Sequence, residues 1–176
     1  YTDTFDEREG DKVSHIHLAD WSDLAVIAPA TANTLAKIAH GIGDNFVTTA
    51  LLATTAPVFI VPAMNEHMLE NAATIRNFQL LENDGHFIME PDTGFLAEGY
   101  EGKGRFPEPE KIVETIQEFL IKKETYLPLK NKKVLLFVRR FISEKALPRF
   151  INSINSLLQQ TDDFIFVIVG DGDEGA

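Results

Sequence analysis

The chain has 176 residues and a mass of 19.7 kDa, which suits one ordinary domain or one domain with an additional fragment. It contains no cysteine, so disulfides, thiolate metal sites and cysteine nucleophiles are excluded. The net charge of −11 argues against a nucleic-acid-binding protein. No apolar stretch is long enough for a transmembrane helix, and we expect no signal peptide. We therefore expect a cytoplasmic protein.

The charge is distributed unevenly between two parts of the chain. Residues 1–125 contain 9 Lys/Arg and 21 Asp/Glu, whereas residues 126–176 contain 7 and 6. The segment 126–133, which lies at this change, is typical of a linker. We therefore expect a main domain in residues 1–125, followed in 126–176 by a linker and a smaller unit.

Predicted strands and helices alternate along the main domain. Buried parallel strands are expected at 24–28 and 57–61, each closed by a proline, and a short third strand at 86–89. The glycine-rich segment 92–107 is predicted to be a long mobile loop. Helices are expected at 15–20, 31–40, 45–53, 69–85 and 109–123. This alternation predicts an α/β fold with a parallel sheet.

The pattern starts again after the linker. Strands are expected at 133–138 and 164–169, with a helix at 145–160 between them. Such a partial βαβ unit cannot bury both faces of its own sheet. It must dock on the first part, belong to a larger domain, or be poorly ordered.

Two predicted strand ends carry residues suited to ligand binding, because ligands of open α/β sheets bind beyond the carboxyl ends of the strands. The segment 29–34 places small residues and two hydroxyls at a helix start, where backbone amides suit a phosphate or an electron-rich ring. A simple threonine N-cap explains it equally well. The segment 62–65 ends in Asn65, which offers both a donor and an acceptor to a polar ligand, or caps the next helix.

The histidines do not form a metal site by their spacing. His15 and His17 are separated by one residue, which is too weak a signal to propose metal binding. The other histidines show no mutual spacing of metal ligands. Taken alone, each is expected to be structural. The glycine-rich run 94–105 is compatible with a hinged flap or with a solvated surface loop.

Four motifs in this order resemble the homo-oligomeric flavin-containing cysteine decarboxylases, which include the phosphopantothenoylcysteine decarboxylases. They are His-Ile-His-Leu-Ala-Asp-Trp-Ser-Asp at 15–23, Ala-Pro-Ala-Thr-Ala-Asn-Thr at 28–34, Pro-Ala-Met-Asn-Glu-His-Met at 62–68, and the flap at 94–105. The resemblance covers residues 1–123. It implies a flavodoxin-like three-layer fold, binding of FMN, and assembly into trimers with FMN at a subunit interface.

The same resemblance implies roles for ten residues. The positions matched to FMN contacts are Thr31, Ala32, Asn33, Thr34 and Ala63. The positions matched to catalytic residues are His15 and Glu98. The positions matched to substrate binding are Met64, Asn65 and Ala97. His15 would act as the acid/base near neutral pH and serve a flavin held by a neighbouring chain. Asn65 would hold the substrate carboxylate.

The implied reaction is the decarboxylation of 4′-phosphopantothenoylcysteine to 4′-phosphopantetheine in coenzyme A biosynthesis. Direct loss of CO2 would leave an unstabilised carbanion. Oxidation of the thiol to a thioaldehyde, with FMN as the electron acceptor, first supplies an electron sink. Loss of CO2 then gives an enethiolate, and the reduced flavin returns the hydride to it to give 4′-phosphopantetheine.

The sequence departs from the family pattern in two places. Glu98 stands where the flap normally carries the cysteine that donates a proton, and it replaces that donor if burial raises its pKa. If it does not, the product is an enethiol, as in the peptidyl-cysteine decarboxylases. In addition, the family's first strand and its Gly/Ser-rich phosphate turn do not precede Tyr1. A catalytically inactive flavin-binding regulatory subunit is the non-enzymatic alternative.

The tail resembles a different family. Residues 133–147 and 164–172 are similar to the opening of the nucleotide-sugar-binding half of a GT-B glycosyltransferase. Arg139 and Ala146 replace two glycines of that pattern. The ligase half that follows the decarboxylase in bifunctional proteins is an alternative for 130–138. Either resemblance predicts an incomplete fragment without activity of its own.

Overall fold

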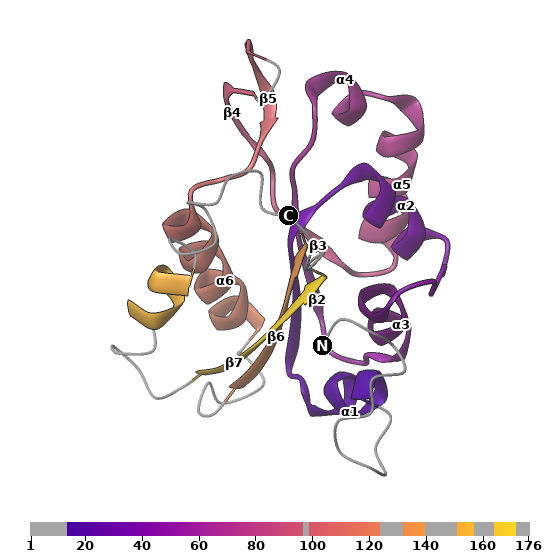
Figure 1. The fold of residues 1–176 in the computed structure, drawn as a ribbon, viewed down its shortest axis with the longest axis vertical. Coiled ribbons are helices and arrows are strands. Elements are labelled where there is room, and N and C mark those ends of the chain that lie inside the picture. Colours follow the sequence, from indigo (N-terminus) through magenta and orange to yellow (C-terminus); the bar gives the residue numbers. More distant parts are fainter. Residues whose placement is uncertain (1–13, 97–98, 124–131, 140–150, 157–163, 172–176) are drawn as a thin grey trace.

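The computed structural model describes residues 14–96, 99–123, 132–139, 151–156 and 164–171 (Figure 1). The elements follow one another as α1 (Ser14–Trp21), β1 (Leu24–Ala30), α2 (Ala32–Ala39), α3 (Phe46–Ala53), β2 (Val58–Pro62), α4 (Glu66–Leu69), α5 (Ala72–Asn83), β3 (Phe87–Ile88), β4 (Asp92–Phe95), β5 (Glu101–Arg105), α6 (Pro109–Lys123), β6 (Lys132–Arg139) and β7 (Phe164–Asp171). No helix in these residues is long and apolar enough to cross a membrane.

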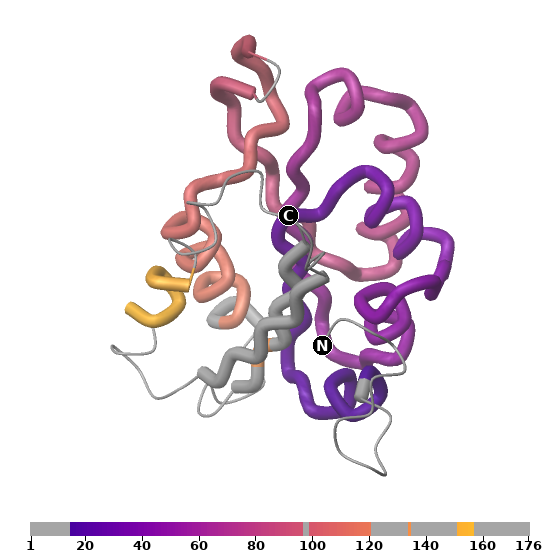
Figure 2. The backbone as a smooth tube through the Cα atoms, in the orientation of Figure 1, coloured from indigo at the N-terminus to yellow at the C-terminus, as the bar shows by residue number. Residues whose placement is uncertain are grey.

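The elements form three layers around a five-stranded sheet. The strand order is β3-β2-β1-β6-β7, and every neighbouring pair is parallel. Helices α1, α2, α3 and α5 lie on one face of this sheet and α6 lies on the other, while the short helix α4 lies beyond the end of β2, near the hairpin (Figures 1 and 2). The predicted α/β fold with a parallel sheet is therefore confirmed.

Strand β1 lies at the centre of the sheet and is buried along its whole length. Leu24 and Val26 pack into the core below α6, whereas Ala25 and Ile27 pack against the helices of the opposite layer. A strand with helices on both faces needs apolar residues at consecutive positions, which explains the unbroken apolar run. Complete burial of a Leu or Ile side chain contributes about 1.5–3 kcal/mol.

Several predicted boundaries shift in the structure. The first strand continues through the expected stop at Pro29 and ends at Ala30. The helix expected at 69–85 is α5, which begins later, at Ala72, and the short helix α4 precedes it. Asn71 separates them because its side-chain oxygen accepts a hydrogen bond from the amide of Ala73 (2.9 Å) and so starts a second helix.

The glycine-rich segment predicted to be a mobile loop is instead an antiparallel hairpin. Strands β4 and β5 pair Gly94 with Gly102 and Phe95 with Glu101. The prediction was wrong because glycine disfavours strands in general, but Gly102 and Gly104 lie on the buried side of β5, where the Glu66 side chain approaches Gly102 and the Met64 backbone approaches Gly104.

The two tail strands belong to the same sheet as the main domain. β6 pairs with β1 from Leu24↔Val134 to Ile27↔Phe137, and β7 pairs with β6. The tail was expected to dock on the main domain, to belong to a larger domain or to be poorly ordered. In the structure, its described strands dock on the main domain. The helix expected at 145–160 is described only at 151–156, and 126–131 lie outside the described residues. The domain boundary near 125 stays a prediction.

Candidate functional site

The carboxyl ends of β1 and β2 are joined at one edge of the sheet. The amide of Ala63, just after β2, donates to the carbonyl of Ala30 at the end of β1 (3.0 Å). This hydrogen bond places the segment that begins at Thr31 beside the one that begins at Ala63. The structure thus brings together the two strand ends that the sequence indicated as binding segments.

Thr31 caps helix α2 at the end of β1. Its hydroxyl lies 3.3 Å from the amide of Thr34 and 3.1 Å from the hydroxyl of Thr34. The amides of Ala32 and Asn33 lie in the first helical turn, where no intrahelical acceptor exists. Small side chains beside such amides leave room for an anionic or electron-rich group, so this segment fits the predicted flavin contact.

The hairpin β4–β5 is attached to the end of β2 by its backbone. The amide of Met64 donates to the carbonyl of Gly104 (3.0 Å), and the amide of Lys103 donates to Glu66 Oε1 (3.0 Å). A Cβ on Gly104, where φ is +129°, would lie 2.1 Å from the carbonyl oxygen of Met64. Only glycine therefore permits this approach.

The amide group of Asn65 is held at both of its atoms. Oδ1 accepts a hydrogen bond from the amide of His67 (2.9 Å), which caps the short helix α4. Nδ2 donates to the hydroxyl of Tyr100 at the turn of the hairpin (2.7 Å). Because Oδ1 is already used by the cap, the side chain presents its NH2 group as the donor for a ligand.

Charged side chains at the base of the hairpin form exposed ion pairs. Lys103 lies 3.3 Å from Glu90, and Arg105 lies 2.7 Å from Glu108. Lys111 on α6 pairs with Asp92 on β4. Exposed pairs of this kind contribute about 0–1 kcal/mol each. They hold the hairpin in place weakly, and the backbone contacts with Met64 and Glu66 are the more specific attachment.

His15 lies apart from this edge of the sheet. It is in the first turn of α1, which leads into the opposite end of β1 (Figure 1). Its ring meets Phe46 of α3 edge-on at 6.2 Å between centroids. Its Nδ1 is buried and has no hydrogen-bond partner among the described residues. No described contact joins His15 to Thr31 or Asn65 within one chain.

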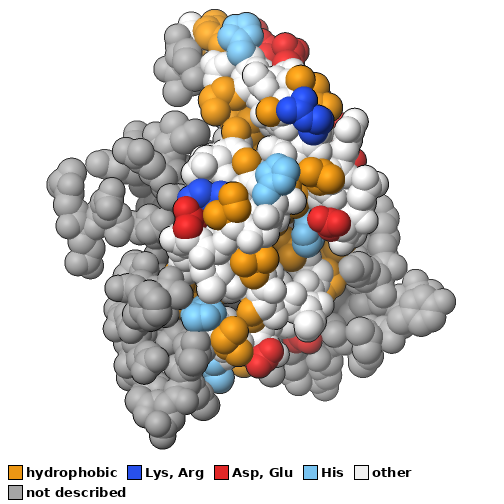
Figure 3. Space-filling model, turned by 90° about the vertical axis from the view of Figure 1, so that its right-hand side faces the viewer, with side chains coloured by type: hydrophobic (Ala, Val, Ile, Leu, Met, Phe, Trp, Pro, Cys, Tyr) orange, Lys and Arg blue, Asp and Glu red, His pale blue; other side chains and the backbone are white. Residues whose placement is uncertain are grey.

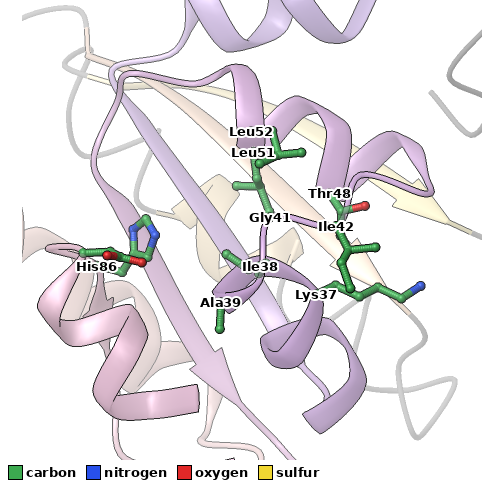
Figure 4. A pocket seen from close by; sticks show the side chains of 10 residues that line it. Lys37, Ile38, Ala39, Gly41, Ile42, Thr48, Leu51, Leu52 and His86 are labelled. Atoms are coloured by element: carbon green, nitrogen blue, oxygen red, sulfur yellow. The ribbon is translucent and has the colours of Figure 1, made fainter. Parts of the chain in front are cut away.

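A separate hollow of about 290 Å³ opens between α2, α3 and the turn before β3 (Figure 4). None of the predicted site residues lines it. His86 lies at this hollow, and burial lowers its pKa, an effect that the charge of Asp84 partly opposes. Lys37, at the opposite side of the hollow, is paired with Asp44 (2.6 Å).

Of the predicted residues, Ala97 and Glu98 lie outside the described part of the chain. The structure places Thr31, Ala32, Asn33, Thr34, Ala63, Met64 and Asn65 at the joined strand ends. Sequence reasoning gave no role to Tyr100 and Gly104, through which the hairpin contacts Asn65 and Met64, or to Glu66 of α4, which accepts from the hairpin amide of Lys103. The glycines of the flap motif were the available signal, since closely spaced glycines in a strand indicate close backbone approach.

Comparison with known proteins agrees with this arrangement. Residues 1–121 match the Flavoprotein family. The coenzyme A biosynthesis bifunctional protein CoaBC of Bacillus subtilis (strain 168) is 51% identical over 136 residues, which cover 77% of this chain and 33% of that protein. The chain therefore spans about a third of that relative.

Solved structures show the same similarity. A cysteine-to-serine mutant of PPC decarboxylase, in complex with pantothenoylaminoethenethiol, is 40% identical with a TM-score of 0.65, covering 69% of this chain and 70% of that one. The FMN binding protein AtHal3 is 40% identical with a TM-score of 0.61, covering 69% of each chain. The match over 1–121, supported by these relatives and by a shared fold, shows that the chain belongs to the Flavoprotein family.

Proposed function

We propose that this chain binds FMN and decarboxylates 4′-phosphopantothenoylcysteine to 4′-phosphopantetheine, as a carbon–carbon lyase of coenzyme A biosynthesis. The observation that carries the proposal is the joining of the Thr31 and Asn65 segments at one edge of the sheet. The named relatives, a CoaBC protein and a PPC decarboxylase, support the same substrate. A cytoplasmic location fits these relatives.

The Thr31 segment is proposed to hold the cofactor. FMN, when bound, supplies the two-electron oxidation of the thiol without which the carboxylate cannot leave. The chain contributes first-turn amides at Ala32 and Asn33, and Ala63 closes the neighbouring strand end with a small side chain. Thr31 and Thr34 fix this turn by bonding to each other.

Asn65 is proposed to hold the substrate carboxylate through Nδ2. The amide of His67 fixes Oδ1, so rotation of the side chain would cost the α4 cap. The NH2 group therefore stays oriented outward as a donor. An N–H donor held in this orientation recognises a carboxylate and disfavours a ligand that has no carboxylate.

His15 is proposed as the acid/base group that serves a site on a neighbouring copy of the chain. Within one chain it lies on α1, at the opposite end of β1 from Thr31. A homo-oligomer, a trimer by family resemblance, would supply the missing imidazole. Glu98 and Ala97 stay predicted contributors from the flap.

The distribution of exposed apolar side chains supports an oligomer. The layer of α1 to α5 exposes large hydrophobic side chains along its outer face, as Figure 3 shows. They are Ile16, Ile42, Leu52, Met68, Ile75 and Leu80. In the described part of α6, no large hydrophobic side chain is exposed. Phe95 and Tyr100 on the hairpin are the other exposed large hydrophobic residues of the described chain. Apolar surface gathered mainly on one layer is typical of an association surface. Light scattering coupled to gel filtration measures the predicted assembly.

The test of the proposed function is turnover by the purified chain supplied with FMN and 4′-phosphopantothenoylcysteine. We expect release of CO2 and formation of 4′-phosphopantetheine, identified by mass spectrometry. A product with two hydrogen atoms fewer would instead support the enethiol-forming alternative, which rests on Glu98 in place of cysteine. A chain that binds FMN without releasing CO2 would support the regulatory alternative.

Asn65→Asp is the diagnostic variant for the site. Aspartate keeps the oxygen that caps α4, but it replaces the donor by a second oxygen that repels the substrate carboxylate. We expect kcat/KM to fall about a hundredfold, because a hydrogen bond to a charged group contributes about 1.5–3 kcal/mol and repulsion adds to its loss.

Asn71→Asp is the matched control. Its Oδ1 accepts from the amide two residues further on at the same distance, 2.9 Å, but it caps α5 away from the joined strand ends. We expect its kcat/KM to equal that of the wild type. Equal losses in both variants would contradict the assignment of Asn65.

A further inference from the structure

The hydrogen bond between Asn65 and Tyr100 leaves one further hydrogen on each donor group. Nδ2 of Asn65 carries two hydrogens and uses one of them toward the Tyr100 hydroxyl, 2.7 Å away. The tyrosine oxygen accepts that bond, so its own proton is available for another acceptor. Two donors therefore lie side by side beyond the end of β2.

The hairpin backbone determines where the Tyr100 ring lies. The carbonyl of Tyr100 accepts a hydrogen bond from the amide of Leu96 (2.8 Å), which closes the hairpin turn. Further along β5, Lys103 donates to Glu66 and Gly104 accepts from Met64, both at 3.0 Å. Because the residues on both sides of Asn65 bond to β5, the tyrosine and the asparagine are held by one connected piece of backbone.

We propose that Tyr100 is a specificity-determining residue whose hydroxyl, together with Nδ2 of Asn65, binds the substrate carboxylate as a two-donor clamp. The inference rests on the proposed function and deepens it. A carboxylate has two oxygens and accepts two parallel hydrogen bonds, which fixes its orientation as well as its position. Tyr100 is 37% exposed and its bond with Asn65 lies at the surface, so a ligand can approach the pair.

The clamp also explains the selection of a carboxylate over a neutral ligand group. The acceptor atoms of the pair are already engaged, because Asn65 Oδ1 accepts from the amide of His67 and the tyrosine oxygen accepts from Nδ2, so the pair offers mainly hydrogens to a ligand. A ligand group that itself donates would leave a donor facing a donor. When the ligand has no carboxylate, neither Asn65 Nδ2 nor the Tyr100 hydroxyl finds an acceptor on it.

The test compares two ligands that differ only in the carboxylate. 4′-Phosphopantothenoylserine keeps the carboxylate but has no thiol to oxidise, and its descarboxy analogue lacks the carboxylate. Their dissociation constants are measured by calorimetry on the flavin-loaded chain, without turnover. In Tyr100→Phe, which keeps the ring, we expect the affinity for the first ligand to fall about tenfold or more and the affinity for the second to stay unchanged.

Phe95→Leu is the matched control, because Phe95 is an exposed aromatic residue of the same hairpin, 66% exposed. It should leave both affinities unchanged. Melting temperatures of both variants show whether the fold is kept. An unchanged preference for the carboxylate in Tyr100→Phe, or an equal loss for both ligands, overturns the clamp while the proposed function stands. A wild-type chain that binds neither ligand contradicts the proposed function and the clamp together.

Discussion

The two strand ends that form the candidate site are built in different ways. At the end of β1, Thr31 bonds to Thr34, three residues further along the chain. At the end of β2, Asn65 bonds to Tyr100, and Met64 bonds to Gly104, on a hairpin far along the sequence. The first end is determined by neighbouring residues, whereas the second depends on tertiary structure.

Because of this difference, the two strand ends should tolerate amino-acid substitutions to different degrees. A local helix N-cap depends on one side chain, and a substitution that removes the cap leaves the surrounding fold in place. A contact between distant backbones depends on a fit that a single added atom destroys. Substitutions at the two ends should therefore differ in the size of their effect on stability. Two predictions measure that difference, and a third, away from both ends, serves as a reference.

The largest effect is expected at Gly104. In Gly104→Ala the new Cβ would lie 2.1 Å from the carbonyl oxygen of Met64, at a φ of +129°. We expect the free energy of unfolding to fall by about 3 kcal/mol or more, measured by urea denaturation. Gly85→Ala is the control, because Gly85 also has a positive φ (+85°) but nothing lies within 4 Å of its Cβ position.

The control should cost about 1 kcal/mol, which is the cost of the left-handed backbone alone. The difference between the two variants then measures the contact between β5 and the end of β2. Equal losses in Gly104→Ala and Gly85→Ala would show that this close approach does not exist in solution.

A smaller effect is expected at the locally built end. Thr31→Ala removes the oxygen that accepts from the amide of Thr34. We expect a loss of about 1 kcal/mol in the free energy of unfolding, since that is the usual value of an N-cap. Thr31→Ser keeps the hydroxyl and should stay close to the wild type. A serine variant as unstable as the alanine variant would contradict the cap.

The smallest effect on stability is expected from a substitution of His86, which lies at neither strand end and serves as a reference for the other two predictions. Burial lowers its pKa in the folded state below the value of about 6.5 in the unfolded chain, with Asp84 partly opposing this. The unfolded chain therefore takes up the proton first as the pH falls. Stability is lost as the pH decreases through about 6.5 and below.

His86→Gln should reduce the difference in melting temperature between about pH 7.5 and about pH 5.5. An unchanged or larger difference in the variant would contradict the lowered pKa. Neither result affects the comparison of the strand ends, because the hollow at His86 contains none of the predicted site residues.

The same contrast explains how far the sequence predicts the structure. The apolar run of β1, the Thr31 cap and the amphipathic helix α6 follow from neighbouring residues, and each was predicted close to its observed position. The hairpin was predicted as a mobile loop, because its strands depend on contacts of Gly102 with Glu66 and of Gly104 with Met64, which are distant in the sequence. The Asn65–Tyr100 bond was not predicted for the same reason.

The candidate site follows this rule as well. Thr31 and Asn65 were indicated by their position after buried strands, which is a local signal. That the two ends are joined through Ala63 and Ala30 requires the strand order, and no periodicity in the sequence determines which strands are neighbours. The roles of Glu66 and Tyr100 require the position of the hairpin.

The position of β1 between β2 and β6 has a consequence for how the chain is synthesised. β2 follows β1 closely in the sequence, but β6 follows only after α6. Among the described strands, the partner on the β6 side of β1 is therefore translated only after α6. An apolar strand with one open edge recruits other strands in that interval. We expect nascent chains that end before Lys132 to depend on chaperones more than longer ones.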